Sequence, residues 1–373
     1  MRLLLSGGGT GGHVYPALAV VEQWKKAETI GDDLPDLDAI LYVGTQSGLE
    51  ADIVGRAGVA FRSVRAAAVR GLSGPQVVVN SFEILKGSIQ AWRILREFGP
   101  DAVLATGGYV SVPVVIAARL QRCPVLVYLP DTVPGLAVRF LSRLAQRVAA
   151  SFDASLGWFA PGKAVVTGYP VRAALYSTDR DGARRRLGLD AEPKTVLVLG
   201  GSRGAHSINA AVSEVLEPLL DLAQVIHIVG KTDITQMQRR RSELRECHRR
   251  RYHVYAYLHE EMIDALLAAD LAVARAGAAS MGEFAAVGLP SIQVPYPYSG
   301  RHQEANADFM VSHSAALKVM DAELAAGGLW RALRELLGDE SALRSMSAAS
   351  RKLARPDAAR AIADQLVLLA GGA

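Results

Sequence analysis

Short apolar runs alternate with helix-length stretches along the whole chain. This alternation is typical of βαβ units, in which helices separate buried parallel strands. The runs that we interpret as strands are residues 2–5, 39–43, 102–105, 125–128, 195–199, 225–229, 254–257, 271–274 and 291–294. We therefore predict an α/β protein with two doubly wound parallel-sheet domains in tandem, and ligands at the carboxyl ends of the strands and in a cleft between the domains.

The pattern pauses once, near the middle of the chain. The apolar runs stop at 167–172, and an arginine-rich, helix-like stretch follows at 181–187. A chain of 373 residues is about two and a half times a typical domain, which agrees with two separate cores. We place the domains at 1–166 and 167–350, followed by a helical C-terminal segment at 351–373.

Composition and charge narrow the class of protein. Hydrophobic residues make up 50% of the chain and charged residues 21%, which excludes a disordered chain. We expect a cytoplasmic protein, because no signal-peptide pattern, membrane-length apolar run or disulfide framework is evident. Residues 53–147 carry twelve Lys or Arg against four Asp or Glu, a net charge of +8 that favours an anionic surface or substrate. The arginines of 239–251 lack interleaved aromatic residues, so we expect a solvated helix face there and no nucleic-acid partner.

Three glycine-rich loops follow predicted strands, at 6–13, 106–111 and 200–205. Exposed backbone N–H groups in such loops bind anions, and glycine lets a phosphate approach closely. The first loop satisfies G-x-G-x-x-G, but Gly44-Thr45-Gln46 follows the second strand where a dinucleotide site would have an acid. A Walker A lysine is also absent. Three loops in two domains therefore favour more than one phosphate-bearing ligand over an NAD site or a P-loop.

A fourth constellation follows the strand that ends near Ala274. The small residues of 275–282 allow close backbone approach to a ligand, and Glu283 lies about two helical turns in. Downstream, the run 301–306 offers donors and acceptors suited to sugar hydroxyls, although a polar helix start explains it equally well. The two D-x-D sequences at 36–38 and 179–181 lie away from the loops, so we interpret them as solvated acids and expect no metal site.

Together these motifs resemble the MurG family of N-acetylglucosaminyltransferases over essentially the whole chain. The matching segments are 8–13 with Pro16, 107–111 with Pro113, 168–172, 200–202, and 275–283 with 288–290. The resemblance implies a GT-B fold: two Rossmann-like domains, an interdomain cleft, and a C-terminal helix that packs back on the first domain. It implies metal-independent, inverting transfer of N-acetylglucosamine from UDP-GlcNAc to lipid I, undecaprenyl-pyrophosphoryl-MurNAc-pentapeptide, forming lipid II and UDP in peptidoglycan synthesis, without a cofactor.

The resemblance also assigns roles to residues. The second domain would bind the donor: Glu283 the ribose, Arg172 and Ser202 the phosphates, Leu258 and His259 the uracil, His302 and Gln303 the sugar hydroxyls, with Arg275, Ala278, Ala279, Ser280 and Met281 lining the nucleotide. The first domain would hold the acceptor diphosphate with Thr10, Gly11, Gly12, Gly107, Gly108, Tyr109 and Ser111.

One departure from the family pattern lies at the acceptor side. Tyr128-Leu129-Pro130-Asp131 stands where the family has His-Glu-Gln-Asn, so Asp131 replaces an asparagine expected near the sugar and acceptor. Arg203 stands where glutamine is common, and Ala105 and Val112 where glycines are common. These departures lie at the acceptor side, so a related transferase with another lipid-linked or hydroxyl acceptor is an alternative. Three other classes are also alternatives: a UDP-sugar epimerase, which shares the two-domain architecture, a dehydrogenase that uses the first loop, and an inactive binding protein.

Inverting transfer requires a group that takes the proton of the attacking hydroxyl. His13 and Asp131 are the candidates. His13 would equally serve as a phosphate-loop contact or helix start, and our hypothesis is that Asp131 supplies the base.

A lipid-linked acceptor requires the enzyme at a membrane. Phe82, Leu85, Ile89 and Trp92 recur at helical spacing beside Lys86, Arg93 and Arg96. This pattern predicts either an interfacial basic helix on an anionic membrane, at the cytoplasmic face of the bacterial cell membrane, or an ordinary core-facing stripe.

Overall fold

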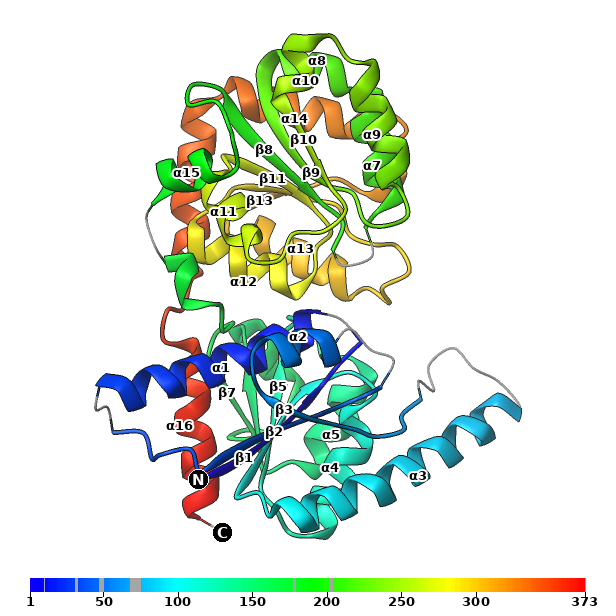
Figure 1. Cartoon of the computed structure of the whole chain (residues 1–373), viewed down its shortest axis with the longest axis vertical. Helices are drawn as coiled ribbons and strands as arrows, with labels where there is room; N and C mark the ends of the chain where they lie inside the picture. Colours follow the sequence, from blue (N-terminus) through cyan, green and yellow to red (C-terminus); the bar gives the residue numbers. More distant parts are fainter. Residues whose placement is uncertain are drawn as a thin grey trace. The chain divides into compact units, whose positions relative to one another are not determined.

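The computed structural model describes residues 1–9, 11–30, 33–46, 50–67, 75–176, 179–201 and 204–372, with the side chains of 75–78 excepted. The chain forms two compact units, each a parallel sheet covered by helices (Figure 1). Unit 1 comprises Met1–Ala173 and Arg355–Ala373, and unit 2 comprises Ala174–Ala354. The chain therefore leaves unit 1 after Ala173 rather than after 166, and returns at Arg355 rather than at 351.

The later boundary has a local cause. Gly168 has a φ of +92°, and a Cβ on it would lie 2.4 Å from the Arg355 Cβ and 3.1 Å from the Ala358 Cβ. The segment where the apolar pattern pauses, at 167–172, thus packs on the residues from Arg355 onward, where the chain returns to unit 1. The helix that follows, α16 (Ala358–Gly371), contacts α1, β4 and β5 of the same unit.

Unit 1 is built on a seven-stranded, all-parallel sheet in the order β3-β2-β1-β4-β5-β6-β7. Leu4 of β1 pairs with Leu41 and Val103, and all three are core residues. The strands are β1 (Arg2–Gly7), β2 (Ala39–Gly44), β3 (Ala60–Ser63), β4 (Ala102–Gly107), β5 (Val125–Leu129), β6 (Arg147–Ala150) and β7 (Ala164–Val166). The helices are α1 (Gly11–Ile30), α2 (Glu50–Arg56), α3 (Pro75–Phe98), α4 (Ser111–Leu120), α5 (Leu136–Leu144) and the 3₁₀ turns η1 (Asp153–Trp158) and η2 (Ala173–Tyr176), the last of which crosses into unit 2.

Unit 2 has a six-stranded parallel sheet in the order β10-β9-β8-β11-β12-β13. The strands are β8 (Lys194–Leu199), β9 (Ala223–Ile228), β10 (Tyr252–Tyr255), β11 (Leu271–Ala274), β12 (Ser291–Gln293) and β13 (Ala316–Lys318). The helices are α6 (Arg180–Arg186), α7 (His206–Glu214), α8 (Leu216–Leu222), α9 (Ile234–Glu243), α10 (Glu246–Arg251), α11 (Glu261–Ala268), α12 (Ala278–Val287), α13 (His302–Ser312), η3 (Asp321–Glu323), α14 (Gly328–Gly338) and α15 (Glu340–Lys352). The predicted α/β class with two doubly wound sheets is confirmed.

The strand order fixes where ligands bind. In unit 1 the order reverses between β1 and β4, and in unit 2 between β8 and β11. Open α/β sheets bind ligands outside the carboxyl ends of their strands at such a switch point. The described parts of all four loops singled out in the sequence follow one of these strands: 8–9 and 108–110 in unit 1, and 200–201 with 204–205, and 275–277, in unit 2.

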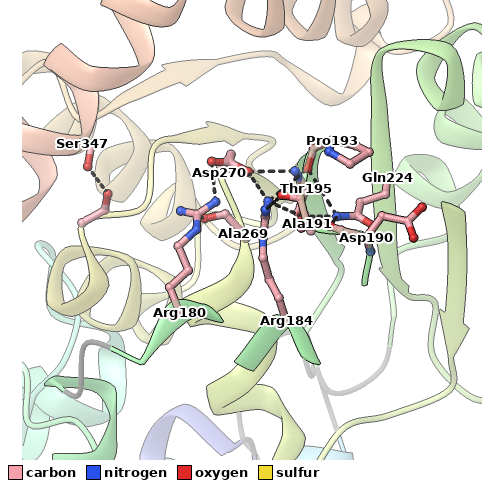
Figure 2. Close-up of polar contacts among 11 residues, drawn as sticks. Arg180, Arg184, Asp190, Ala191, Pro193, Thr195, Gln224, Ala269, Asp270 and Ser347 are labelled. Carbon is pink, nitrogen blue, oxygen red and sulfur yellow. Dashed lines mark hydrogen bonds and ion pairs between the residues drawn. The ribbon is translucent and has the colours of Figure 1, made fainter. Parts of the chain in front are cut away.

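The opposite, amino edge of the unit 2 sheet carries an ion network instead (Figure 2). The Asp270 carboxylate accepts from Arg180 at 2.5 Å, from Arg184 at 3.2 Å and from the Thr195 N–H at 2.8 Å. Buried Gln224 on β9 donates to the Thr195 hydroxyl at 3.0 Å. These contacts attach α6 to the starts of β8, β9 and β11, away from the ligand edge.

Both D-x-D sequences have local structural roles. The Asp179 carboxylate accepts from the Gly182 N–H at 2.9 Å at the start of α6, and this hydrogen bond lowers the pKa of Asp179 below its usual value. Asp38 pairs with the N-terminal ammonium at 2.8 Å. Within the described residues, no group of three or more His, Cys, Asp or Glu side chains is placed to hold a metal ion. The described helices include none that is both long enough and apolar enough to cross a bilayer.

Candidate active site

The two glycine loops of unit 1 pack backbone against backbone at the switch point. Gly108 has a φ of +80°, and a Cβ on it would lie 2.4 Å from the Gly8 carbonyl oxygen. Gly107, with a φ of +104°, lies against the His13 ring, since a Cβ there would be 3.0 Å from the His13 Cε1. Only glycine permits this approach, so the loops form one continuous surface of backbone groups at the ends of β1 and β4.

His13 is held in a defined tautomer. Its Nδ1 lies 2.7 Å from the Thr106 carbonyl oxygen, and the Thr106 hydroxyl donates to the His13 carbonyl at 2.5 Å. Because a carbonyl oxygen only accepts, Nδ1 carries the hydrogen, and Nε2 of the neutral ring keeps its lone pair. The half-buried ring is thus oriented as a base or acceptor.

The other predicted acceptor residues differ in their surroundings. Gly11 and Gly12 begin α1, and the Tyr169 hydroxyl donates to the Gly12 carbonyl at 3.5 Å. Tyr109 is exposed, whereas Ser111 is fully buried and its hydroxyl lies 2.8 Å from the Gly107 carbonyl oxygen. The Ser111 side chain therefore supports the loop from within. Thr10 lies outside the described residues.

Sequence reasoning missed Glu50, which lies beneath the first loop. Its carboxylate is fully buried and accepts from the Thr45 N–H at 2.9 Å and the Thr45 hydroxyl at 2.5 Å. A Cβ on Gly8 would lie 2.7 Å from the same Oε1, and among the described residues Oε2 has no hydrogen-bond partner. The dinucleotide-site pattern places its acid directly after the second strand, whereas Glu50 lies six residues beyond Gly44, the last residue of β2. The signal available in the sequence was Glu50 itself, an acidic residue at the start of α2 whose carboxylate lies back against Thr45, directly after β2.

Asp131 and Arg172 both belong to unit 1. Asp131 follows β5, is half-buried, and its main-chain carbonyl accepts from the Ser155 hydroxyl at 3.2 Å. The Arg172 guanidinium lies 5.4 Å from the centre of the Tyr15 ring, a cation–π contact with α1. Arg172, expected with the donor residues, therefore lies on the unit that carries the acceptor loops.

In unit 2 the start of α12 presents uncapped backbone donors at the switch point. Gly277 precedes the helix without a side-chain cap, and the first turn has no acidic residue. The first-turn N–H groups, from Ala278 to Ser280, are thus available to an anion, whose charge the helix dipole also favours. Met281 is buried in the core, and Glu283 is half-buried one turn further on.

Arg275 braces this edge of the sheet. Its guanidinium pairs with Asp321 at 2.5 Å, donates to the Ser207 hydroxyl at 2.8 Å and to the Val294 carbonyl at 3.3 Å, and is only 10% exposed. It also lies 5.3 Å from the centre of the Tyr296 ring. Arg275 thereby joins the ends of β11, β12 and β13 to α7.

The remaining donor residues follow the same strand ends. The Gln303 side chain accepts from the Tyr296 N–H at 2.9 Å, and half-buried His302 begins α13. Leu258 is buried after β10, and the exposed His259 ring stacks edge-on against Tyr257 at 4.7 Å. The structure thus places the remaining candidate donor residues in the loops and helices that follow β10, β11 and β12 of one sheet: Leu258, His259, Arg275, 278–281, Glu283, His302 and Gln303. Ser202 lies outside the described residues.

Comparisons with known proteins match this arrangement. The N-terminal domain of glycosyltransferase family 28 matches residues 3–150, and its C-terminal domain matches residues 195–362. The fold and the two loop-bearing edges are thus those of a family 28 glycosyltransferase.

Similar proteins along the full length specify the family. A UDP-N-acetylglucosamine–N-acetylmuramyl-(pentapeptide) pyrophosphoryl-undecaprenol N-acetylglucosamine transferase from Roseiflexus sp. is 42% identical over 97% of this chain and 94% of its own. Its namesake from Moorella thermoacetica is 40% identical over 97% of each chain. The chain belongs to this family, the MurG family.

Solved structures agree. The crystal structure of Acinetobacter baumannii MurG has a TM-score of 0.71 at 27% identity, covering 98% of this chain and 99% of its own. A UDP-GlcNAc 2-epimerase from Neisseria meningitidis, bound to UDP-GlcNAc, has a TM-score of 0.69 at 14% identity, covering 99% and 100%, and shares the fold.

Proposed function

We propose that this protein transfers N-acetylglucosamine from UDP-GlcNAc to lipid I, forming lipid II and UDP. The observation that carries the proposal is a pair of sheet edges, one at the switch point of each sheet, with glycine loops in unit 1 and an uncapped helix start in unit 2, in a chain 42% identical to a transferase of this kind. Both substrates of that reaction contain a diphosphate. Two separate edges of glycine loops and helix starts match two such substrates.

In the proposed mechanism unit 2 holds the donor. The diphosphate lies at the start of α12 and at the glycine loop after β8, where backbone N–H groups and helix dipoles stabilise the charge that grows on departing UDP. Glu283 holds the ribose hydroxyls, and His302 and Gln303 hold the sugar. Arg275 is a positioning residue, because its guanidinium is engaged by Asp321 and Ser207.

Unit 1 holds the acceptor, with its diphosphate on the backbone surface made by the loops after β1 and β4. The attacking hydroxyl gives its proton to a base as it displaces UDP with inversion. The fixed tautomer of His13 supports His13 Nε2 as that base. Asp131 is the alternative, and Arg172 on Tyr15 supplies positive charge from the same unit.

Product analysis with the donor alone separates this function from that of the epimerases, which share the fold. UDP-GlcNAc incubated with the protein and no acceptor should be recovered as UDP-GlcNAc, because a transferase lacks a route between donor isomers. Chromatography or NMR of the recovered nucleotide sugar measures this. Accumulation of an isomeric UDP-sugar would contradict the proposal.

Helix α3 carries an exposed apolar stripe that suits contact with the membrane in which a lipid-linked acceptor lies. Phe82, Leu85, Ile89 and Trp92 are 58%, 56%, 49% and 36% exposed, so the core-facing alternative for this stripe is wrong. A groove of about 340 Å³ lies beside it, lined by Ser81, Ile84, Leu85, Ser88, Ile89, Trp92, Ile116 and Leu120. We infer that α3 inserts this stripe into the anionic cytoplasmic face of the cell membrane, with Lys86, Arg93 and Arg96 at the headgroups.

A vesicle experiment tests the membrane proposal. The protein should sediment with vesicles that contain anionic lipid, and less so in high salt. Phe82→Ser with Leu85→Ser should lower the partition coefficient about a hundredfold or more, because each buried apolar side chain contributes about 1.5–3 kcal/mol. Leu222→Ser, at a 47% exposed leucine in unit 2, is the matched control and should leave partition unchanged. Equal partition of the double variant and the wild type would refute the proposal.

A further inference from the structure

A buried chain of polar side chains lies behind the glycine loop of unit 2. Its members are Tyr252, His227, Asn209 and Asp233, which are 0%, 0%, 1% and 5% exposed. The Tyr252 hydroxyl lies 2.9 Å from His227 Nδ1, His227 Nε2 lies 3.1 Å from Asn209 Oδ1, and Asn209 Nδ2 donates to Asp233 at 2.8 Å. The chain ends at His206, whose Nδ1 lies 3.1 Å from the Asp233 carboxylate.

The hydrogen-bond geometry fixes the protons along this chain. Asn209 Oδ1 only accepts, so His227 Nε2 donates and Nδ1 accepts from Tyr252. Burial lowers the pKa of His227 to about 3, which keeps the ring neutral at physiological pH. Every donor and acceptor of the His227 and Asn209 side chains is therefore used in one arrangement.

The hydrogen-bond network also reaches a main-chain carbonyl that shapes the loop. The second Asn209 Nδ2 hydrogen goes to the Val229 carbonyl oxygen at 2.8 Å. A Cβ on Gly204 would lie 2.4 Å from that same oxygen, and Gly204 has a φ of +79°. The side chain of Asn209, on α7, thus holds the strand-end carbonyl against which the last glycine of the loop packs.

Stability alone does not require this arrangement. The neighbouring core positions of this unit, such as Val225, Ile208 and Val212, are apolar, and apolar residues of similar volume stabilise a core at least as well as a buried polar network. A fully satisfied network instead specifies one geometry. Here the specified geometry is that of the carboxyl edge at β8 and β9, next to the switch point.

We propose that Asn209 and His227 are positioning residues that hold the Val229 carbonyl, and through it Gly204, in the conformation that receives the diphosphate of the donor. The inference rests on the proposed function, which places that diphosphate at the loop after β8. The proposal predicts a specific defect. Loss of this hydrogen-bond network should weaken binding of the donor phosphates and leave binding of the nucleoside unchanged.

Calorimetric titration with UDP and with uridine tests this inference. For His227→Phe and Asn209→Leu, the Kd for UDP should rise about tenfold while the Kd for uridine stays within about twofold of wild type. His227→Gln, whose amide can still donate to Asn209, should recover most of the UDP affinity. Gln224→Met is the matched control: this buried side chain lies on the same strand, at the amino edge, so its loss should lower Tm without changing either Kd (Figure 2).

The possible outcomes distinguish a failure of this inference from a failure of the proposed function. Unchanged UDP affinity in folded His227→Phe and Asn209→Leu, or an equal loss for UDP and uridine, would overturn the inference. If His227→Phe fails to fold, Asn209→Ser makes the same test, because serine is too short to reach the Val229 carbonyl. Wild-type protein that binds UDP no more tightly than uridine would instead contradict the proposed placement of the donor diphosphate.

Discussion

Replacement of His13 by glutamine is expected to lower kcat about 10²–10⁴-fold and to leave the KM for UDP-GlcNAc unchanged. The hydrogen bond from the Thr106 hydroxyl to the main-chain carbonyl of residue 13 does not involve the side chain that is replaced, so the loop conformation should persist. Glutamine lacks the basic Nε2 lone pair that the structure orients. Steady-state kinetics with saturating acceptor measures both effects.

Asp131→Asn is the companion variant that separates the two candidate bases. If His13 is the base, Asp131→Asn should keep most of the wild-type kcat with saturating acceptor. A His13→Gln variant within a few-fold of wild-type kcat, together with a large loss in Asp131→Asn, would transfer the role to Asp131. Full turnover in Asp131→Asn would show that Asp131 is not the base that takes the proton of the attacking hydroxyl.

Asp321→Ala is expected to lower the free energy of unfolding of unit 2 by about 3 kcal/mol and to raise the KM for UDP-GlcNAc with little change in kcat. Its carboxylate holds Arg275, whose side chain is only 10% exposed, so removal leaves a buried guanidinium without its counter-charge. The same guanidinium fixes the ends of β11 and β12. Denaturant titration and steady-state kinetics measure the two effects.

Asp308→Ala is the matched control for that variant. Asp308 pairs with Lys318, but their side chains are 55% and 27% exposed, and such exposed pairs contribute about 0–1 kcal/mol. The account of Arg275 as a brace would be wrong if Asp321→Ala and Asp308→Ala lowered stability equally. It would also be wrong if Asp321→Ala left the donor KM unchanged.

Most of the strands that the sequence predicted are buried, but burial alone does not separate them from the strands that were missed. The predicted runs in β1, β4, β5 and β11 lie inside or coincide with the observed strands, because a strand buried between helix layers is a continuous apolar run. Four strands, β3, β6, β7 and β13, were not predicted. Strand β3 is largely exposed, and β6, β7 and β13 have only three or four residues each, so none of the four left a distinct apolar run. The stripe on α3 shows the limit of periodicity, since the same spacing describes a core face and an exposed one.

The candidate site was predictable where it depends on backbone. The glycine loops at 8–12 and 107–108 are recognisable because a close backbone approach admits few other residues. The side-chain partners were not. Arg275 meets Asp321 and Ser207, which lie 46 and 68 residues away, and such pairings depend on the tertiary fold alone. The sequence placed Arg172 in the second domain, but the segment 168–172 packs on unit 1.

The most direct test of the central claim is release of UDP from UDP-GlcNAc by the purified protein, with and without a short-chain lipid I analogue, followed by separation and NMR of the products. The account predicts acceptor-dependent release of UDP and a new disaccharide lipid whose added sugar has the β configuration, since transfer inverts the α-linked donor. Release of UDP at the same rate without the acceptor, or a donor that is bound but never transferred to lipid I, would contradict it.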